Sequence, residues 1–317
     1  MKRRIVALAI SFILFFILGC QNEDGNQFKI KGKIAVVVST MDNQWFVVLA
    51  DSAKNRAEEL GYEAKIFDSK NDISVEAAHF DEIIARGYKA ILFNPTDAER
   101  SIPNVINAKR AGIPTFCMDR ELKSNDAAVS QILTDSYTGC VELGRYFVDK
   151  LNRKGNYVEL LGVESSDNTW SRSKGFHSVV DKCPGLKMVA QQSADYDRKK
   201  ATAVLSSMLR KHSNIDAVFC GNDAMAMGAY DAMVSAGKES KVLIMGFDGA
   251  EDVINAIMQK KISATVMQFP KLIAKTTADM ADKYIKDGKR NFQRKIYTDV
   301  RLITEENVGL WKIYWMR

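Results

Sequence analysis

The stretch KIAVVVSTMDNQWF, at residues 33–46, contains the signal that decides the fold. Its first six residues form an apolar run with several β-branched side chains, which is typical of a buried strand in a parallel sheet. Apolar residues then recur at helical spacing from Phe46 to Leu60, and Gly61 ends the run as a helix C-cap does. The stretch therefore predicts a strand followed by a helix, which is the repeating unit of α/β folds.

The same unit repeats along most of the chain. Short apolar runs at residues 90–93, 157–161, 217–220 and 242–245 predict further strands, and amphipathic helices are expected between them. Strands that alternate with helices form parallel, doubly wound sheets. The sequence therefore predicts an α/β fold made of such sheets.

Residues 90–120 and 217–249 repeat the unit in a more specific way. Each segment reads as a strand, an asparagine, a helix ending in Ala-Gly, a second strand and an aspartate. The polar pair is Asn94 and Asp119 in the first copy and Asn222 and Asp248 in the second. Two similar lobes are the simplest interpretation, and the alternative is the general likeness of all strand–helix units. Matching polar residues at matching strand ends favour two lobes.

Polar and aromatic side chains gather where the predicted strands end. Ligands of open parallel sheets bind beyond the carboxyl ends of the strands. If two lobes face each other, one cleft collects Asn43, Trp45, Phe46, Asn94, Asp119, Arg120, Asn222, Phe247 and Asp248. Adjacent residues of a helix diverge by about 100°, so Trp45 and Phe46 cannot stack side by side on one face of a ligand.

This set of side chains suits a neutral polyhydroxyl ligand. Carboxylates accept hydrogen bonds from hydroxyl groups, arginine donates in a fixed fork, and asparagine does both. Aromatic rings pack on the apolar C–H faces of a sugar ring. No glycine-rich phosphate loop follows the first strand, and no histidine accompanies the set. Asp119 and Asp248 could still act as an acid–base pair, as in a glycosidase, so an enzyme remains an alternative.

The N-terminus is predicted to be a secretion signal. Three basic residues precede an apolar stretch, residues 5–18, that is too short to span a bilayer comfortably. It ends in Gly19-Cys20, which resembles the lipobox of bacterial lipoproteins, in which the cysteine carries the lipid. The alternative is an ordinary signal peptide with an incidental cysteine. We expect a signal peptide at 1–19, a lipidated tether at 20–27, and an exported protein anchored by Cys20 to the periplasmic or extracellular face of a bacterial membrane.

Composition sets further bounds on the function. With 46% hydrophobic and 26% charged residues, the chain is typical of a globular protein. Removal of residues 1–19 takes away three basic residues and no acids, so the net charge of +6 falls to +3, too little to indicate nucleic-acid binding. The histidines show no ligand-like spacing, so neither a metal nor a cofactor is predicted. Buried free thiols are expected at Cys117, Cys140, Cys183 and Cys220.

From about residue 33 to 304 the sequence resembles the type I periplasmic sugar-binding proteins, and most closely the ribose-binding group. The stretches that carry the resemblance are VVSTMDNQWF, FNPTDAE, MDRE, SRSKGF, ADYDR, GNDAMAMGA, GFDG and TVMQFP. The resemblance implies ligand contacts from the residues of the cleft and adds Arg172, Tyr196 and, at a hinge crossing, Gln268. Trp45 and Tyr196 stand where that group has phenylalanine. Ribose is the first expectation, and another pentose, a hexose such as allose or psicose, or a short sugar alcohol is left open.

The resemblance also implies an architecture and a mechanism. Two Rossmann-like lobes joined by three hinge strands are expected, with residues 28–133 plus 269–292 in the N-terminal lobe and 134–268 plus 293–317 in the C-terminal lobe and tail. The lobes would close over a monosaccharide and dock on the permease of an ABC transporter. A monomer without enzymatic activity is expected. A sensing accessory protein of a chemoreceptor or histidine kinase is an alternative, and a lactose-repressor-type regulator would need an N-terminal helix-turn-helix.

Several of these residues also have purely structural interpretations. Phe46 and Phe247 could belong to the core, and Arg172 could pair with a surface acid. Asp119 and Asp248 could be helix N-caps. Asn94 could mark a turn before Pro95. The aromatic residues of the last ten positions, 308–317, are expected to pack on a lobe edge, and the alternative is that they form a contact surface.

Overall fold

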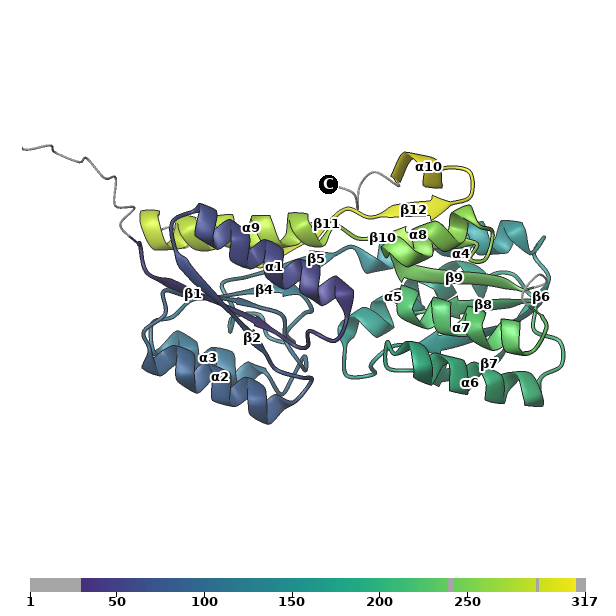
Figure 1. Cartoon of the computed structure of the whole chain (residues 1–317), viewed down its shortest axis with the longest axis horizontal. Helices are drawn as coiled ribbons and strands as arrows, with labels where there is room; N and C mark the ends of the chain where they lie inside the picture. Colours follow the sequence, from purple (N-terminus) through teal and green to yellow (C-terminus); the bar gives the residue numbers. More distant parts are fainter. Residues whose placement is uncertain (1–29, 239–241, 289–290, 312–317) are drawn as a thin grey trace, which may run out of the picture.

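The computed structural model describes residues 30–238, 242–288 and 291–311 and shows two α/β lobes side by side (Figure 1). The predicted signal peptide, tether and lipidated Cys20 lie outside the described residues, as do Tyr314 and Trp315. Among the described residues, no helix is both long enough and apolar enough to cross a membrane.

The first lobe is built on a six-stranded sheet with the strand order β11-β5-β4-β3-β1-β2. Every pairing in it is parallel. Its strands are β1 (Lys33–Val38), β2 (Glu63–Asp68), β3 (Ala90–Phe93), β4 (Thr115–Asp119), β5 (Ser130–Thr134) and β11 (Lys295–Thr298). The order β2-β1-β3-β4-β5 is that of a doubly wound sheet whose strand order reverses between β1 and β3.

The second lobe repeats this topology, with the order β12-β10-β9-β8-β6-β7. All its pairings are parallel except that of β10 with β12, which is antiparallel. Its strands are β6 (Gly155–Leu161), β7 (Leu186–Ser193), β8 (Ala217–Cys220), β9 (Leu243–Asp248), β10 (Ala264–Met267) and β12 (Arg301–Thr304). The two lobes predicted from the internal repeat are therefore present.

Helices cover both faces of each sheet. In the first lobe, α1 (Gln44–Glu59) and α9 (Pro270–Asp287) pack on one face, and α2 (Ile73–Ala85) and α3 (Ile102–Arg110) pack on the other. In the second lobe, one face carries α4 (Ser136–Lys150) and α5 (Asp167–Val180), and the other carries α6 (Arg198–Lys211), α7 (Asp223–Ser235) and α8 (Glu251–Met258). Because both faces are covered, central strands such as β3 and β8 are apolar throughout rather than alternating, and both are buried at every position.

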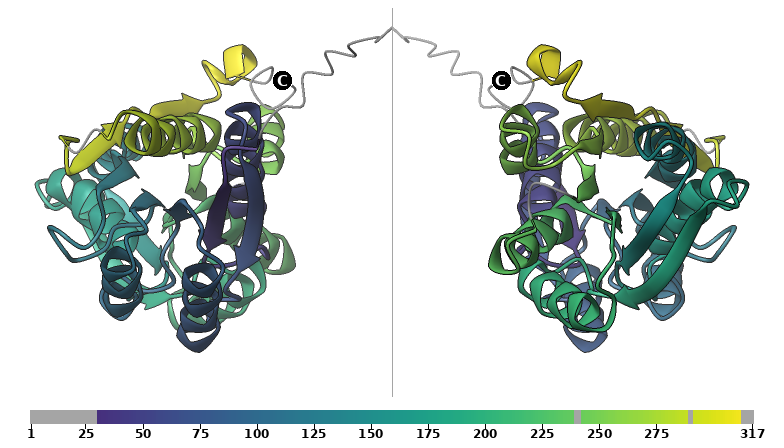
Figure 2. Two further views of the ribbon diagram at one scale, coloured as in Figure 1. Left: turned by 90° about the vertical axis from the view of Figure 1, so that its left-hand side faces the viewer. Right: turned by 90° about the vertical axis from the view of Figure 1, so that its right-hand side faces the viewer.

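The chain crosses between the lobes after β5, after β10 and after β11. We predicted the last crossing at residue 292, and this boundary is wrong: Lys295–Thr298 still belongs to the first sheet, where it pairs in parallel with β5. The crossing follows Thr298, and no glycine or proline separates β11 from β12 to mark it in the sequence. Figure 2, which looks along the long axis, shows α9 and the β11–β12 segment on the same side of the molecule.

The short helix α10 (Val308–Trp311) packs on the second lobe. The ring of Trp311 lies 6.3 Å from that of Phe269, which fits the expectation that the aromatic tail packs on a lobe edge. The four described cysteines are buried free thiols, as predicted.

Candidate functional site

The carboxyl ends of the two sheets face each other across a small inner chamber of about 20 Å³, which is room for on the order of one water molecule. The residues that line it are Asn43, Trp45, Phe46, Asp119, Arg120, Asn168, Arg172, Tyr196, Asn222, Asp248 and Gln268. Any organic ligand larger than a few atoms therefore needs the lobes or the lining side chains to move before it can enter.

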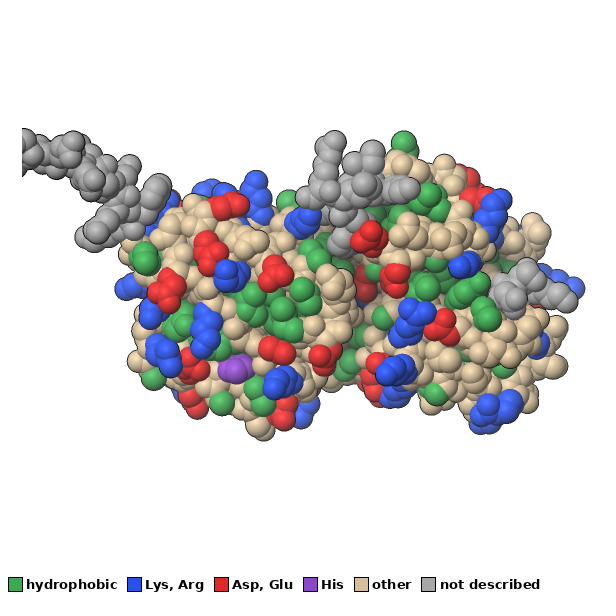
Figure 3. Space-filling model, viewed as in Figure 1, with side chains coloured by type: hydrophobic (Ala, Val, Ile, Leu, Met, Phe, Trp, Pro, Cys, Tyr) green, Lys and Arg blue, Asp and Glu red, His purple; other side chains and the backbone are tan. Residues whose placement is uncertain are grey.

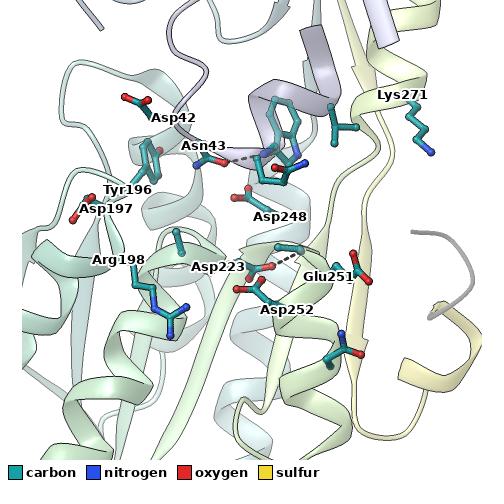
Figure 4. Close-up of a pocket in the computed structure, with 16 residues that line it drawn as sticks. Asp42, Asn43, Tyr196, Asp197, Arg198, Asp223, Asp248, Glu251, Asp252 and Lys271 are labelled. Atoms are coloured by element: carbon teal, nitrogen blue, oxygen red, sulfur yellow. Dashed lines mark hydrogen bonds between the residues drawn. The ribbon is translucent and has the colours of Figure 1, made fainter. Parts of the chain in front are cut away.

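An outer cleft of about 750 Å³ adjoins the chamber and shares four lining residues with it: Asn43, Trp45, Tyr196 and Asp248. Figure 4 shows this cleft, with residues of α1, α6, α7, α8 and α9 around it. Six of its sixteen lining residues are acidic and two are basic, and the space-filling view shows acidic side chains along the furrow between the lobes (Figure 3). The chamber and the cleft therefore share a wall.

Asp119 is the acidic group that the first lobe brings to the chamber. It ends β4 with φ of 65° and is 3% exposed. Its Oδ2 accepts a hydrogen bond from Asn94 Nδ2 at 3.3 Å, and its Oδ1 accepts one from Asn168 Nδ2 at 3.2 Å. Burial raises the pKa of Asp119, while the charges of Arg172 and Arg120 oppose that rise.

Asp248 is its counterpart in the second lobe, at the end of β9. Its Oδ1 accepts a hydrogen bond from Gln268 Nε2 at 2.7 Å and lies 3.5 Å from Arg172 Nη1. Burial raises its pKa to about 7, against the opposing effect of the Arg172 charge. Neither aspartate is a helix N-cap: β5 is the next element after Asp119, and the N-cap of α8 is Ala250.

The two arginines of the chamber lie over aromatic rings. The guanidinium of Arg120 lies 4.9 Å from the ring centre of Phe46. That of Arg172 lies 3.8 Å from the Phe247 ring and 5.6 Å from the Tyr196 ring. Arg172 Nη1 also donates to the carbonyl oxygen of Gly221 at 2.6 Å, and the residue is only 4% exposed, so the interpretation as a partner of a surface acid is wrong.

Three aromatic side chains complete the walls. The rings of Trp45 and Phe46 meet edge to face, at 5.4 Å and 88°, so they do not form one flat stacking surface. Tyr196 comes from the second lobe, and its hydroxyl pairs with Thr169 Oγ1 at 2.8 Å. Its ring lies so close to Gly162 that a Cβ atom there would be 2.0 Å from Cζ of Tyr196. Position 162 therefore has to be glycine for the tyrosine to reach the chamber.

The asparagines predicted for the site have different roles. Asn43 and Asn222 are the N-caps of α1 and α7, where their Oδ1 atoms accept from backbone N–H groups, and each leaves its amide NH₂ at the chamber. Asn94 is completely buried and does not line the chamber. It accepts from Ser39 Oγ at 2.7 Å and donates to the Met118 carbonyl oxygen at 3.0 Å, so it ties the ends of β1, β3 and β4 together.

Of the twelve predicted site residues, all but Asn94 and Phe247 line the chamber. Phe247 is fully buried core beneath Arg172. Asn168 lines the chamber and was missed by the sequence analysis. It lies one helical turn before Arg172 on α5, and this i, i+4 spacing on one helix face is the signal that could have found it.

The described residues contain no cluster of three or more histidine, cysteine, aspartate or glutamate side chains that could hold a metal ion. The basic side chains of the outer cleft are partly engaged, since Arg198 forms a two-pronged pair with Asp231 at 2.8 and 3.0 Å. Asp223 is buried, and its carboxylate accepts from Thr265 Oγ1 and from the backbone N–H of Ala250, both at 2.7 Å. It therefore supports the end of β9 rather than presenting a free carboxylate to the cleft.

Comparisons with known proteins agree with this architecture. The family described as "Periplasmic binding protein domain" matches residues 34–290. A D-apiose import binding protein of Paraburkholderia graminis is 40% identical over 316 residues, covering 100% of this chain and 99% of the relative. A ribose import binding protein of Haemophilus influenzae is 36% identical over 272 residues, covering 86% of this chain and 91% of the relative.

The fold is shared with solved structures. A periplasmic solute-binding protein of an ABC transporter from Actinobacillus succinogenes, with bound D-allose, has a TM-score of 0.82 and 27% identity. The match covers 88% of this chain and 100% of that one. The predicted fold of two doubly wound lobes is confirmed by these matches and by the two sheets.

Proposed function

Since the chain belongs to the family of periplasmic binding protein domains, we propose that it is an exported, non-enzymatic protein that captures a pentose between its lobes and delivers it to an ABC-type permease. D-Apiose and D-ribose are the first candidates, because relatives named for their import match at 40% and 36% identity. The observation that carries the proposal is the set of two carboxylates and two guanidinium groups around one chamber.

The chemistry of the chamber suits a neutral sugar. The carboxylates of Asp119 and Asp248 accept hydrogen bonds from hydroxyl groups, and Arg120 and Arg172 donate to hydroxyl or ring oxygens. The rings of Trp45, Phe46 and Tyr196 supply apolar walls that exclude water and strengthen those polar contacts. The exact pentose depends on the ring contacts, because Trp45 and Tyr196 are the positions that differ from the ribose-binding group.

A hydrolytic role for the two aspartates has less support. Each carboxylate is already held in place, Asp119 by two asparagines and Asp248 by Gln268 and Arg172. Such fixed acceptors suit recognition of hydroxyl groups. The relatives named above are import binding proteins rather than hydrolases. Prolonged incubation with pentoses and pentosides is expected to leave them unchanged.

Hinge closure is the mechanism we propose for capture. Asn168 of the second lobe donates to Asp119 of the first, and Lys123 lies 3.8 Å from Asp167 at the rim. Gln268, at the crossing after β10, accepts from Thr134 Oγ1 at 2.6 Å at the crossing after β5. Because the same Gln268 donates to Asp248, a sugar bound to that carboxylate acts on the hinge directly.

A ligand screen tests this function. The chain from residue 28 onward is heated in the presence of D-apiose, D-ribose, D-allose, L-arabinose and myo-inositol. A ligand at about 100 times its Kd stabilises a folded protein by roughly 2.7 kcal/mol, so the bound sugar is identified by its rise in Tm. Small-angle scattering with that sugar should show a smaller radius of gyration. If none of these sugars raises the Tm, or if none of them reduces the radius of gyration, the proposal is rejected.

We also propose that Cys20 carries a lipid that holds the monomeric protein on the membrane. The support is the Gly19-Cys20 junction after a short apolar run. Cys20→Ala is expected to abolish labelling with a radioactive fatty acid and to release the protein from membranes. Labelling equal to that of the unaltered chain would reject the anchor.

A further inference from the structure

Two buried N–H groups at the chamber have no hydrogen-bond partner. Within residues 30–238, 242–288 and 291–311, the buried side-chain atoms without a partner are five hydroxyl oxygens and two nitrogens, Trp45 Nε1 and Arg172 Nε. A hydroxyl can rotate toward any nearby acceptor, whereas an indole or guanidinium N–H points in a direction that its ring plane fixes. Both nitrogens belong to residues that line the same chamber.

We propose that the indole N–H of Trp45 donates a hydrogen bond to an oxygen of the bound sugar. This inference rests on the proposed function and adds to it a polar contact at a position that the sequence indicates only as an aromatic wall. Trp45 is 7% exposed and lines both the chamber and the outer cleft. A buried donor without a partner costs free energy, and such donors are rare in folded proteins. An acceptor atom of the ligand removes that cost.

The neighbours of Trp45 hold its indole ring in one orientation. The backbone N–H of Trp45 is capped by Asn43 Oδ1 at 2.9 Å, which fixes the start of α1 and with it the direction of the side chain. The edge-to-face contact with Phe46 further limits the rotation of the indole. The ring is therefore oriented before a ligand arrives, and little rotational entropy is lost on binding.

The two N–H groups come from different lobes, which relates the proposed hydrogen bond to hinge closure. Trp45 is on α1 of the first lobe, and Arg172 is on α5 of the second. A sugar that accepts from both bridges the lobes, so these hydrogen bonds form together only in the closed state. The closed state then gains free energy from the ligand, as hinge closure requires.

Trp45→Phe is the variant that tests the donor, because it keeps an aromatic wall and removes only the indole N–H and part of the ring. Calorimetric titrations with D-ribose and D-apiose are expected to show an affinity lower by about 5-fold to 150-fold, the range for leaving one buried polar group unpaired. Trp170→Phe is the matched control. Trp170 is 38% exposed, and its Nε1 already donates to the carbonyl oxygen of Glu164, so that variant should bind as the wild type does.

A second measurement does not depend on the size of the ring. The chain has four tryptophans, so a ¹⁵N–¹H spectrum contains at most four indole signals, and the one lost in Trp45→Phe belongs to Trp45. Saturating sugar should move this signal downfield in the proton dimension and slow its exchange with water, and leave the Trp170 signal in place. If Trp45→Phe binds within about twofold of the wild type, or if the Trp45 signal does not respond to bound sugar, the inference is overturned and the proposed function stands. If no pentose binds the wild type at all, the proposed function is what fails.

Discussion

Asp119→Asn is the substitution that best tests whether Asp119 binds the sugar or only stabilises the fold. Asp119 has φ of 65°, a left-handed conformation that asparagine tolerates better than alanine does, so the backbone of β4 can stay as it is. The amide has nearly the same shape as the carboxylate, removes the charge and turns one acceptor into a donor. The new amide oxygen can still accept from Asn94, and Asn168 can turn its own amide so that its oxygen accepts from the new NH₂ group.

The expected effects on binding and on stability differ. If the carboxylate accepts a sugar hydroxyl, loss of the charge-assisted hydrogen bond costs about 1.5–3 kcal/mol, or roughly 10-fold to 150-fold in affinity. Folding stability should change little or rise near neutral pH. Burial raises the pKa of Asp119 in the folded protein, so the ionised form opposes folding there, and asparagine cannot ionise.

Titration calorimetry with the sugar found in the screen, together with urea melts of the same proteins, measures both effects. Asp126→Asn is the control, because it removes one acidic charge from an exposed loop of the same lobe, where the side chain of Asp126 is 79% exposed. It should leave affinity and melt midpoint unchanged. An Asp119→Asn protein that binds within about twofold of the wild type and melts at lower urea would refute the role in binding.

Four further substitutions test the second lobe and the interface. The pKa of Asp248 is raised from 3.8 to about 7, so the sugar-free protein should lose stability as pH rises from about 4 to 7. Sugar affinity should increase over the same range, because the carboxylate becomes ionised. In Asp248→Asn, circular-dichroism melts and calorimetric titrations should show a weaker dependence on pH for both quantities. Gly162→Ala would place a Cβ atom 2.0 Å from the ring of Tyr196, so the tyrosine would have to shift. Titration calorimetry should then show an affinity lower by about fivefold or more. An affinity equal to that of the wild type would contradict this role of Gly162. Asn168→Ala removes an interlobe hydrogen bond to a carboxylate and should weaken binding by about fivefold or more in titration calorimetry. Asp167→Asn breaks a partly exposed ion pair at a separation of 3.8 Å and should cost less than about fivefold; equal losses would contradict the assignment.

Much of the fold could be predicted because the hydrophobic pattern indicates the order of strands and helices. Central strands such as β3 and β8 are buried on both faces and therefore read as continuous apolar runs between helices. The crossing after Thr298 could not be placed, because β11 and β12 are short, partly exposed and separated by two residues without a turn signal. Their assignment to different sheets depends on pairing with distant strands, which local sequence does not encode.

The site residues that could be predicted are those that lie at the ends of strands. Asp119 and Asp248 follow apolar strands, and their positions are visible in the sequence. The likeness of Asn94 and Asn222 misled in detail: Asn222 caps α7, whereas Asn94 is buried behind the chamber and α3 begins later, with Ser101 as its N-cap. Asn168 was missed because it lies in the first turn of a helix rather than at the end of an apolar strand, and its role depends on a contact with the other lobe.

The charges of the chamber explain how the lobes can part and still hold a neutral ligand. Each lobe contributes one carboxylate and one guanidinium to the chamber, Asp119 with Arg120 and Asp248 with Arg172, so each half of the chamber holds one acid and one base. Across the chamber, Arg172 also acts on Asp119 and partly opposes the rise in that carboxyl's pKa. A neutral ligand leaves this balance intact, whereas a charged one would bring a buried charge without a partner, which costs several kcal/mol or more. The same balance therefore permits opening and favours an uncharged ligand.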